Sequence, residues 1–163
     1  MIVVADAGPI HYLVLIEVVD VLSPLYDRVL IPQTVAEELR RERAPEIVRS
    51  WLEHPPEWCR LQPDPASDPT LDETLDPGER AAIALALSTS ADRLLIDDWE
   101  GRLEAERRRL KVTGTLGVLA EAHRRHLLDF ESALARLSQT SFYLSEDLVN
   151  KMRQRLADQN PDR

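Results

Sequence analysis

Acidic residues stand at the ends of apolar runs, or at the starts of helical segments, in four distant parts of the chain. These acids are Asp6, Glu37 and Glu38, Glu79, and the pair Asp97 and Asp98. Their type suits a divalent-metal hydrolase, because Mg²⁺ and Mn²⁺ take oxygen ligands in near-octahedral geometry. Several carboxylates in one cleft repel each other unless a cation holds them together. The pattern therefore predicts a metal-dependent hydrolytic site.

Each acid also has a structural explanation when it is taken alone. Asp6, Asp97 or Asp98 can cap the helix that follows it, and Glu79 can complement a helix dipole. Glu38 can be a solvated helical residue. Only the joint arrangement of these acids favours the metal site.

The acids need a scaffold that brings them together, and the chain has the alternating pattern of an α/β fold. Short apolar runs predict strands, and segments with helical spacing or helix-start signals predict helices. Such alternation is typical of a parallel sheet covered on both faces, with sites beyond the carboxyl ends of the strands. The expected strands are residues 2–5, 29–31, 58–61, 93–96 and 111–113, and the expected helices are 8–22, 32–39, 45–52, 77–87, 100–110, 115–125, 130–137 and 145–156.

Composition limits the classes of protein to consider. The 163 residues fit one domain, and the single Cys59 cannot form an internal disulfide. No apolar run approaches the length of a membrane span, so we expect a cytoplasmic protein without membrane contact. The net charge of −9 argues against an indiscriminate nucleic-acid coat protein.

The order and spacing of four segments carry a resemblance to a known family. The segments are Asp6-Ala7-Gly8-Pro9-Ile10, Glu38-Leu39, residues 77–86, and residues 94–98 followed by 112–117. Together they resemble a PIN domain, and more narrowly a prokaryotic PIN-like group related to VapC-type toxins. The resemblance extends over nearly all of residues 1–150, which we expect to form the nuclease domain. Residues 151–163 are then expected to be the end of the last helix and a charged tail.

The resemblance implies an α/β/α sandwich with a central, mostly parallel sheet and a Mg²⁺- or Mn²⁺-dependent endoribonuclease activity. It also implies a homodimer and the role of toxin beside a cognate antitoxin. By position, the catalytic and metal-ligating acids are Asp6, Glu38, Glu79 and Asp98. Asp97 is the alternative to Asp98. The resemblance favours Asp98 because the acid of the family follows the final two residues of the strand, and alternation along a strand places the two neighbours on different faces.

Three further residues are candidates for contacting the RNA substrate. Arg80 follows Glu79, and Arg102 lies four residues after Asp98. Both can contact phosphate, or can form salt bridges that organise the acids. Thr115 resembles a position that supports a metal-bound water, and it can equally be a helix cap.

Two other functions remain alternatives at this point. A PIN-like module can keep the fold and the acids but act only by binding an antitoxin or an RNA-processing partner. A phosphoryl-transfer protein also uses a strand-end Asp with Mg²⁺, but Asp6 has no second acid beside it and no Lys follows a late strand.

Overall fold

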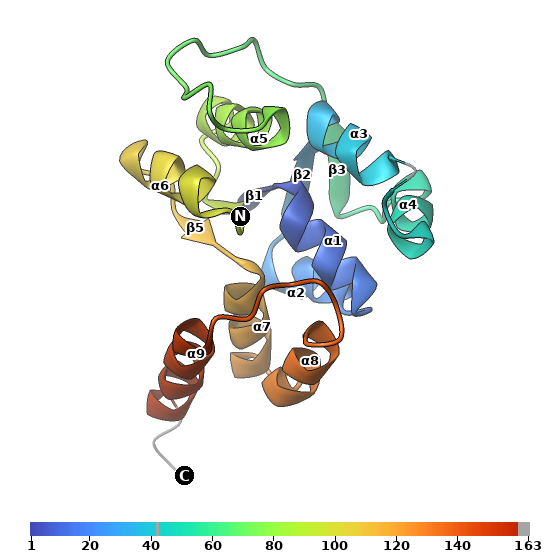
Figure 1. The fold of residues 1–163 in the computed structure, drawn as a ribbon. Coiled ribbons are helices and arrows are strands. Elements are labelled where there is room, and N and C mark those ends of the chain that lie inside the picture. Colours follow the sequence, from blue (N-terminus) through green and yellow to red (C-terminus); the bar gives the residue numbers. More distant parts are fainter. Residues whose placement is uncertain (42, 160–163) are drawn as a thin grey trace.

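A five-stranded sheet forms the centre of the computed structural model, which describes residues 1–41 and 43–159 (Figure 1). The strands lie in the order β3-β2-β1-β4-β5, and every neighbouring pair is parallel. This confirms the expected parallel sheet. Part of the expected tail, residues 160–163, lies outside the described residues. The strands are β1 (Ile2–Ala5), β2 (Arg28–Pro32), β3 (Cys59–Gln62), β4 (Arg93–Leu95) and β5 (Val112–Thr113).

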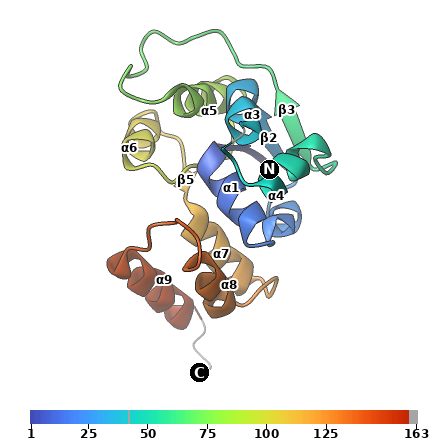
Figure 2. The ribbon, with the colours of Figure 1, turned by 45° about the vertical axis from the view of Figure 1, so that its right-hand side comes forward.

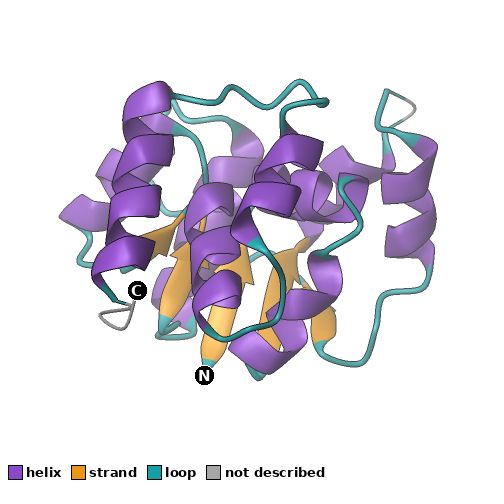
Figure 3. Cartoon of the chain, turned by 90° about the horizontal axis from the view of Figure 1, so that it is seen from below, coloured by secondary structure: helices purple, strands orange, loops and turns teal. Residues whose placement is uncertain are grey.

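Helices cover both faces of this sheet, as Figure 3 shows from below. The chain moves from β1 to β3 in one direction and then returns through β4 to β5. Helix α5 packs over β1, β2 and β4, and it also contacts α3 and α6. The helices are α1 (Ala7–Leu15), α2 (Leu22–Leu25), α3 (Gln33–Arg40), α4 (Glu46–Glu53), α5 (Pro77–Ser88), α6 (Trp99–Arg107), α7 (Thr115–Arg124), α8 (Phe130–Leu137) and α9 (Glu146–Asp158).

The first helix is shorter than the sequence indicates. We expected it to continue to residue 22, but α1 ends at Leu15. Glu17 adopts a left-handed φ of 62°, and the Val18 amide donates to the Leu13 carbonyl. This is the hydrogen-bond pattern that closes helices. Pro24 then lies in the first turn of α2, where the missing N–H is tolerated.

The core consists of the strands and the apolar sides of the helices. In β1 and β4, Val3, Val4, Leu94 and Leu95 are fully buried. A strand buried on both faces reads as a continuous apolar run, which explains why the sequence identifies it clearly. The polar groups that leave these strands therefore emerge together at their carboxyl ends.

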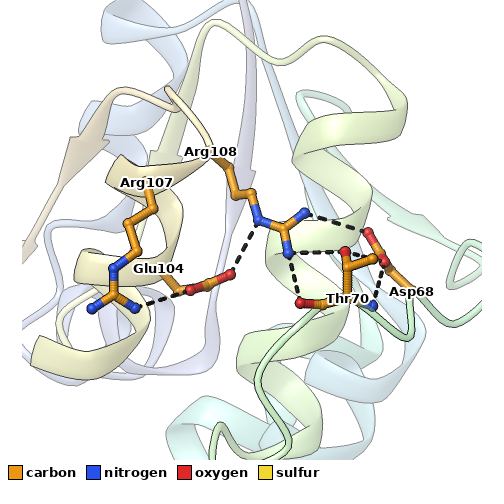
Figure 4. Close-up of polar contacts among 5 residues, drawn as sticks. All are labelled: Asp68, Thr70, Glu104, Arg107 and Arg108. Carbon is orange, nitrogen blue, oxygen red and sulfur yellow. Dashed lines mark hydrogen bonds and ion pairs between the residues drawn. The ribbon is translucent and has the colours of Figure 1, made fainter.

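Arg108 ties the loop of residues 63–76 to the end of α6 (Figure 4). Its guanidinium donates to the Thr70 carbonyl at 2.8 Å and to the Thr70 hydroxyl at 2.9 Å, and it lies 3.8 Å from Asp68. The same side chain pairs with buried Glu104 at 3.1 Å. This loop leads directly into α5, so Arg108 helps to fix where α5 begins.

We predict that Arg108→Ala lowers the free energy of unfolding by about 1–3 kcal/mol, because buried Glu104 loses its main partner. Arg107→Ala is the matched control, since exposed Arg107 makes a single bond to the same acid. Its cost should be at most about 1 kcal/mol. Urea denaturation measures both values, and hydrogen exchange should quicken in the 63–76 loop of Arg108→Ala alone. Equal effects of the two substitutions would contradict this role of Arg108.

Candidate active site

Asp6 and Asp97 leave adjacent strands at the same edge of the sheet. Ala5 is the register partner of Leu95, and the Asp6 amide donates to the Leu95 carbonyl at 2.9 Å. Asp6 is only 8% exposed, and the charge of Asp97 contributes to raising its pKa. The two carboxylates therefore occupy one partly enclosed region beyond β1 and β4.

Asp97 and Asp98 point in different directions, and they have different partners. Asp97 accepts hydrogen bonds from the Thr115 amide at 2.7 Å and from the Thr115 hydroxyl at 2.6 Å. Asp98 is exposed and caps α6 by accepting from the Gly101 amide at 3.0 Å. The charge of Asp97 thus acts on Asp6, whereas the charge of Asp98, at the start of α6, acts on Glu79.

Glu79 is positioned by a reciprocal capping box at the start of α5. Its amide donates to the Asp76 carboxylate at 2.8 Å, and its own carboxylate accepts from the Asp76 amide at 3.3 Å. Pro77 at the first helical position needs no amide partner, which suits this start. The capping box holds Glu79 in a buried position next to the other acids.

Glu38 approaches α5 from α3 and packs against Gly78. A Cβ atom at Gly78 would overlap the Glu38 carboxylate, so this carboxylate keeps its position only while residue 78 has no side chain. Burial, followed by the charge of Asp76, raises the pKa of Glu38. The hydrogen bond from the Gly78 amide opposes this rise only in part. Glu38 therefore lies near Glu79, because Gly78, against which it packs, directly precedes Glu79 in α5.

Asp76 is a further acid of this region, and it is not among the acids that the sequence analysis singles out. Its charge raises the pKa of Asp6, Glu38 and Glu79. Because the signature Asp-Pro-Gly-Glu fully explains a helix start, nothing in the sequence alone distinguishes Asp76 as part of an acidic cluster. Only the fold brings it next to the other carboxylates.

Burial and mutual repulsion keep protons on these acids. Burial, followed by the charges of Asp76, Glu38 and Asp97, raises the pKa of Asp6 to about 7. Burial together with Asp76 and Asp98 raises the pKa of Glu79 to about 8. Burial also raises the pKa of Asp97, despite the opposing effects of Thr115 and Arg102. Such a cluster carries an electrostatic cost that a divalent cation relieves.

The candidate substrate-binding residues lie around this cluster in three different ways. Arg80 has a buried Nε without a hydrogen-bond partner among the described residues. Arg102 is half-buried beside Gly114, and its charge lowers the pKa of Asp97. Thr115 is fully buried and gives its hydroxyl to Asp97, so its place is to orient that acid and not to touch substrate. Gly114, not Thr115, is the N-cap of α7.

Comparison with known proteins identifies the family of the chain. A model of the PIN-domain family DUF3368 matches residues 2–158. The chain belongs to the PIN-domain family. None of the curated proteins compared with the chain matches it. PIN domains are generally nucleases, which supports a possible nuclease role for this chain.

A solved structure shows the same fold. It is a PilT N-terminus domain protein, SSO1118, from the hyperthermophilic archaeon Sulfolobus solfataricus P2. The superposition has a TM-score of 0.51 at 14% identity, and it covers 89% of this chain and all of the other. This likeness confirms the α/β/α fold class of the PIN domain. Among the residues that the structure describes, none of the helices combines the length and apolarity that a membrane span needs.

The acids of this PIN domain fit a hard divalent cation by their chemistry, but they do not form a preformed cage. Within residues 1–41 and 43–159, no three acidic, His or Cys side chains converge closely enough to enclose a metal ion. The donors at the sheet edge are all carboxylate oxygens, which suit Mg²⁺ or Mn²⁺. Asp6 and Glu79 are buried and keep their protons, and a bound cation would take the place of these protons. Asp6 and Asp97 are the acids best placed to begin that coordination.

We predict that the metal-free protein loses stability as the pH rises from about 4 to about 8. Folded Asp6 keeps its proton up to about pH 7, and folded Glu79 up to about pH 8. In the unfolded chain both acids ionise near pH 4. The folded state therefore binds more protons in this window, and the free energy of unfolding falls with pH.

Thermal denaturation in EDTA across this pH range measures the effect. Asp6→Asn should flatten the profile and raise the melting temperature at pH 8, because it removes a buried charge without changing the shape of the side chain. Mn²⁺ should raise the melting temperature of the wild-type protein at pH 8 more than that of Asp6→Asn. Exposed Glu57→Gln is the control. A wild-type melting temperature that does not change with pH would show that folding does not raise the pKa of these acids.

We predict that Gly78→Ala displaces Glu38 and lowers both Mn²⁺ affinity and stability. Alanine favours the helix itself, so any loss of stability comes from the overlap with the Glu38 carboxylate. The double variant Gly78→Ala/Glu38→Ala should therefore regain stability, with a coupling energy of about 0.5 kcal/mol or more in a double-mutant cycle. Additive effects of the two substitutions would mean that the side chain at position 78 does not interact with the Glu38 carboxylate.

Proposed function

We propose that this PIN domain is a Mg²⁺- or Mn²⁺-dependent endoribonuclease that hydrolyses RNA phosphodiester bonds with a metal-activated water. The observation that carries the proposal is the electrostatic coupling of acids at the carboxyl edge of the sheet. The charges of Glu38 and Asp97 act on buried Asp6, and the charge of Asp76 acts on Asp6, Glu38 and Glu79. Family membership supports it, since PIN domains typically use divalent metals. Asp6, Asp97, Glu38 and Glu79 would hold the cation, with Asp98 in a supporting position.

This assignment exchanges the order of Asp97 and Asp98 given by the resemblance. The charge of Asp97 acts on Asp6, and Asp97 is oriented by two hydrogen bonds, whereas Asp98 is exposed and already caps α6. Residues that orient a ligand are typical of metal centres. Thr115 therefore serves as the positioning residue for Asp97.

A bound divalent cation would supply Lewis-acid stabilisation of phosphate charge and a water of lowered pKa. The residues of the chain perform the other tasks. Asp6 and Asp97 fix the direction from which the phosphate must approach, because they leave adjacent strands. Arg102 and Arg80 would provide positive charge for the non-bridging phosphate oxygens. Buried carboxylates at this edge act as ligands and not as nucleophiles.

We further propose that the protein acts as the toxin of a toxin–antitoxin pair, as a homodimer in the cytoplasm with a cognate antitoxin as partner. Family membership and the resemblance to VapC-type toxins support this setting. Expression of the wild-type protein should then arrest growth, and Asp6→Asn should relieve the arrest. A protein that binds a partner but never cleaves RNA would instead be the interaction module that the sequence left open.

We predict that Asp6→Asn and Asp97→Asn each lower Mg²⁺- or Mn²⁺-dependent RNA cleavage by roughly 100-fold or more, since the loss of even a supporting group at a metal site costs about 10- to 100-fold. Asp98→Asn should retain more activity than Asp97→Asn, because its main structural contact is a helix cap. Cleavage of labelled RNA with metal and in EDTA, with circular dichroism as the folding control, measures this. Cleavage that is equal in EDTA would refute the metal mechanism.

A further inference from the structure

A cleft opens next to the acids and continues along α9. It encloses about 1050 Å³ and lies between α7, the edge strand β5 and the α9 helix, with residues 141–145 at one rim. Asp97, Asp98 and Arg102 line one end of it. Figures 1 and 2 show α6, β5, α7 and α9 along the same side of the molecule. We refer to this feature as the α7–α9 cleft.

One face of α9 contributes positive charge to the cleft. Lys151 and Arg155 are exposed, lie one helical turn apart, and line the cleft together with Leu148 and Met152. Arg153, on another face of α9, is instead paired with Glu131 at 2.7 Å. The cations on the cleft face thus lie along a line that leads away from the acids.

Other charged side chains that line the cleft already have partners within the protein. Arg93 donates to the Thr113 hydroxyl at 2.6 Å, and Arg125 pairs with Glu121 at 3.1 Å. Asp147 is an acid on the cleft face of α9. In a chain of net charge −9, five cations line this cleft with four acids, of which Asp97 and Asp98 belong to the candidate metal site. This local excess suits a polyanion.

Aromatic rings at the cleft are exposed to a degree that packing does not explain. Trp99 is 71% exposed at the start of α6, and Tyr143 is 86% exposed on the rim formed by residues 141–145. Nearby Phe142 is by contrast packed edge-to-face on Tyr12, with ring centroids 5.0 Å apart. Exposed rings beside a positively charged groove are platforms on which unpaired bases stack.

We propose that the α7–α9 cleft binds a single-stranded nucleic acid that extends from the acids along α9. Trp99 and Tyr143 stack on its bases, and Lys151 and Arg155 contact its phosphates. Stacking on protein rings requires bases that are not paired in a duplex, so a single strand is favoured over a double helix. The inference rests on the proposed nuclease function and assigns to it a binding track and the residues that form it.

Binding is measured in EDTA with a short fluorescein-labelled single-stranded RNA of mixed sequence, by fluorescence anisotropy over a range of salt concentrations. Lys151→Gln/Arg155→Gln should lower the slope of log K against log salt by about 1.4, as expected for two lost phosphate contacts on a single strand. Trp99→Ala and Tyr143→Ala should each weaken binding roughly fivefold or more, as expected for a lost base stack. A duplex of the same sequence should bind more weakly than the single strand.

Arg43→Gln/Arg60→Gln is the matched control, since both arginines are exposed and neither lines the cleft. This control should leave the affinity within about twofold of wild type, because neither removed charge lines the cleft and salt screens exposed charges that make no direct contact. If both double variants weaken binding equally, the effect is one of net charge and the proposed track is wrong.

The outcomes separate this inference from the proposed function. If the cleft variants cleave and bind RNA like wild type, the track is refuted while the nuclease function stands. If the cleft variants weaken binding but metal-dependent cleavage is absent from the wild-type protein, the nuclease function fails and the binding track stands. If wild type does not bind the strand and Lys151→Gln/Arg155→Gln instead converts a dimer to a monomer in sedimentation, the cleft is a protein interface and the proposal is overturned.

Discussion

Repulsion among carboxylates at the carboxyl edge of the sheet is the constraint around which this PIN domain is arranged. Asp6 and Asp97 leave register partners on adjacent strands, so their proximity follows from the parallel pairing of β1 and β4. Asp76, Glu38 and Glu79 arrive from α3 and from the start of α5. Burial makes their charges costly, and the raised pKa of Asp6 and Glu79 is the direct consequence.

Local structure compensates for part of that cost. Two Thr115 hydrogen bonds hold Asp97, a capping box holds Glu79, and the absence of a side chain at Gly78 admits Glu38. Arg108 fixes the loop that leads into α5. These contacts orient the acids without neutralising them, because most of the donors are uncharged amides or hydroxyls. The remaining negative charge is available to a cation.

The sequence predicted the scaffold, whereas the choice among the site acids stays a prediction. Strands such as β1 and β4 are buried on both faces and read as continuous apolar runs, and helix starts such as Asp76-Pro77 carry local signals. The choice between Asp97 and Asp98 depends on where β4 ends and on a hydrogen bond to Thr115, a residue 18 positions away. The α7–α9 cleft depends on how α9 packs on α7, which no local pattern encodes.

The most direct test of the central claim is a crystal structure of the protein grown with Mn²⁺, with anomalous scattering measured to locate the ion. The account predicts Mn²⁺ at the carboxyl edge of β1 and β4, bound by Asp6 and Asp97, with Glu38 or Glu79 drawn toward it. An ordered site edge with no Mn²⁺ at saturating concentration, and with the carboxylates in their metal-free positions, would contradict the claim that these acids gather to hold a divalent cation.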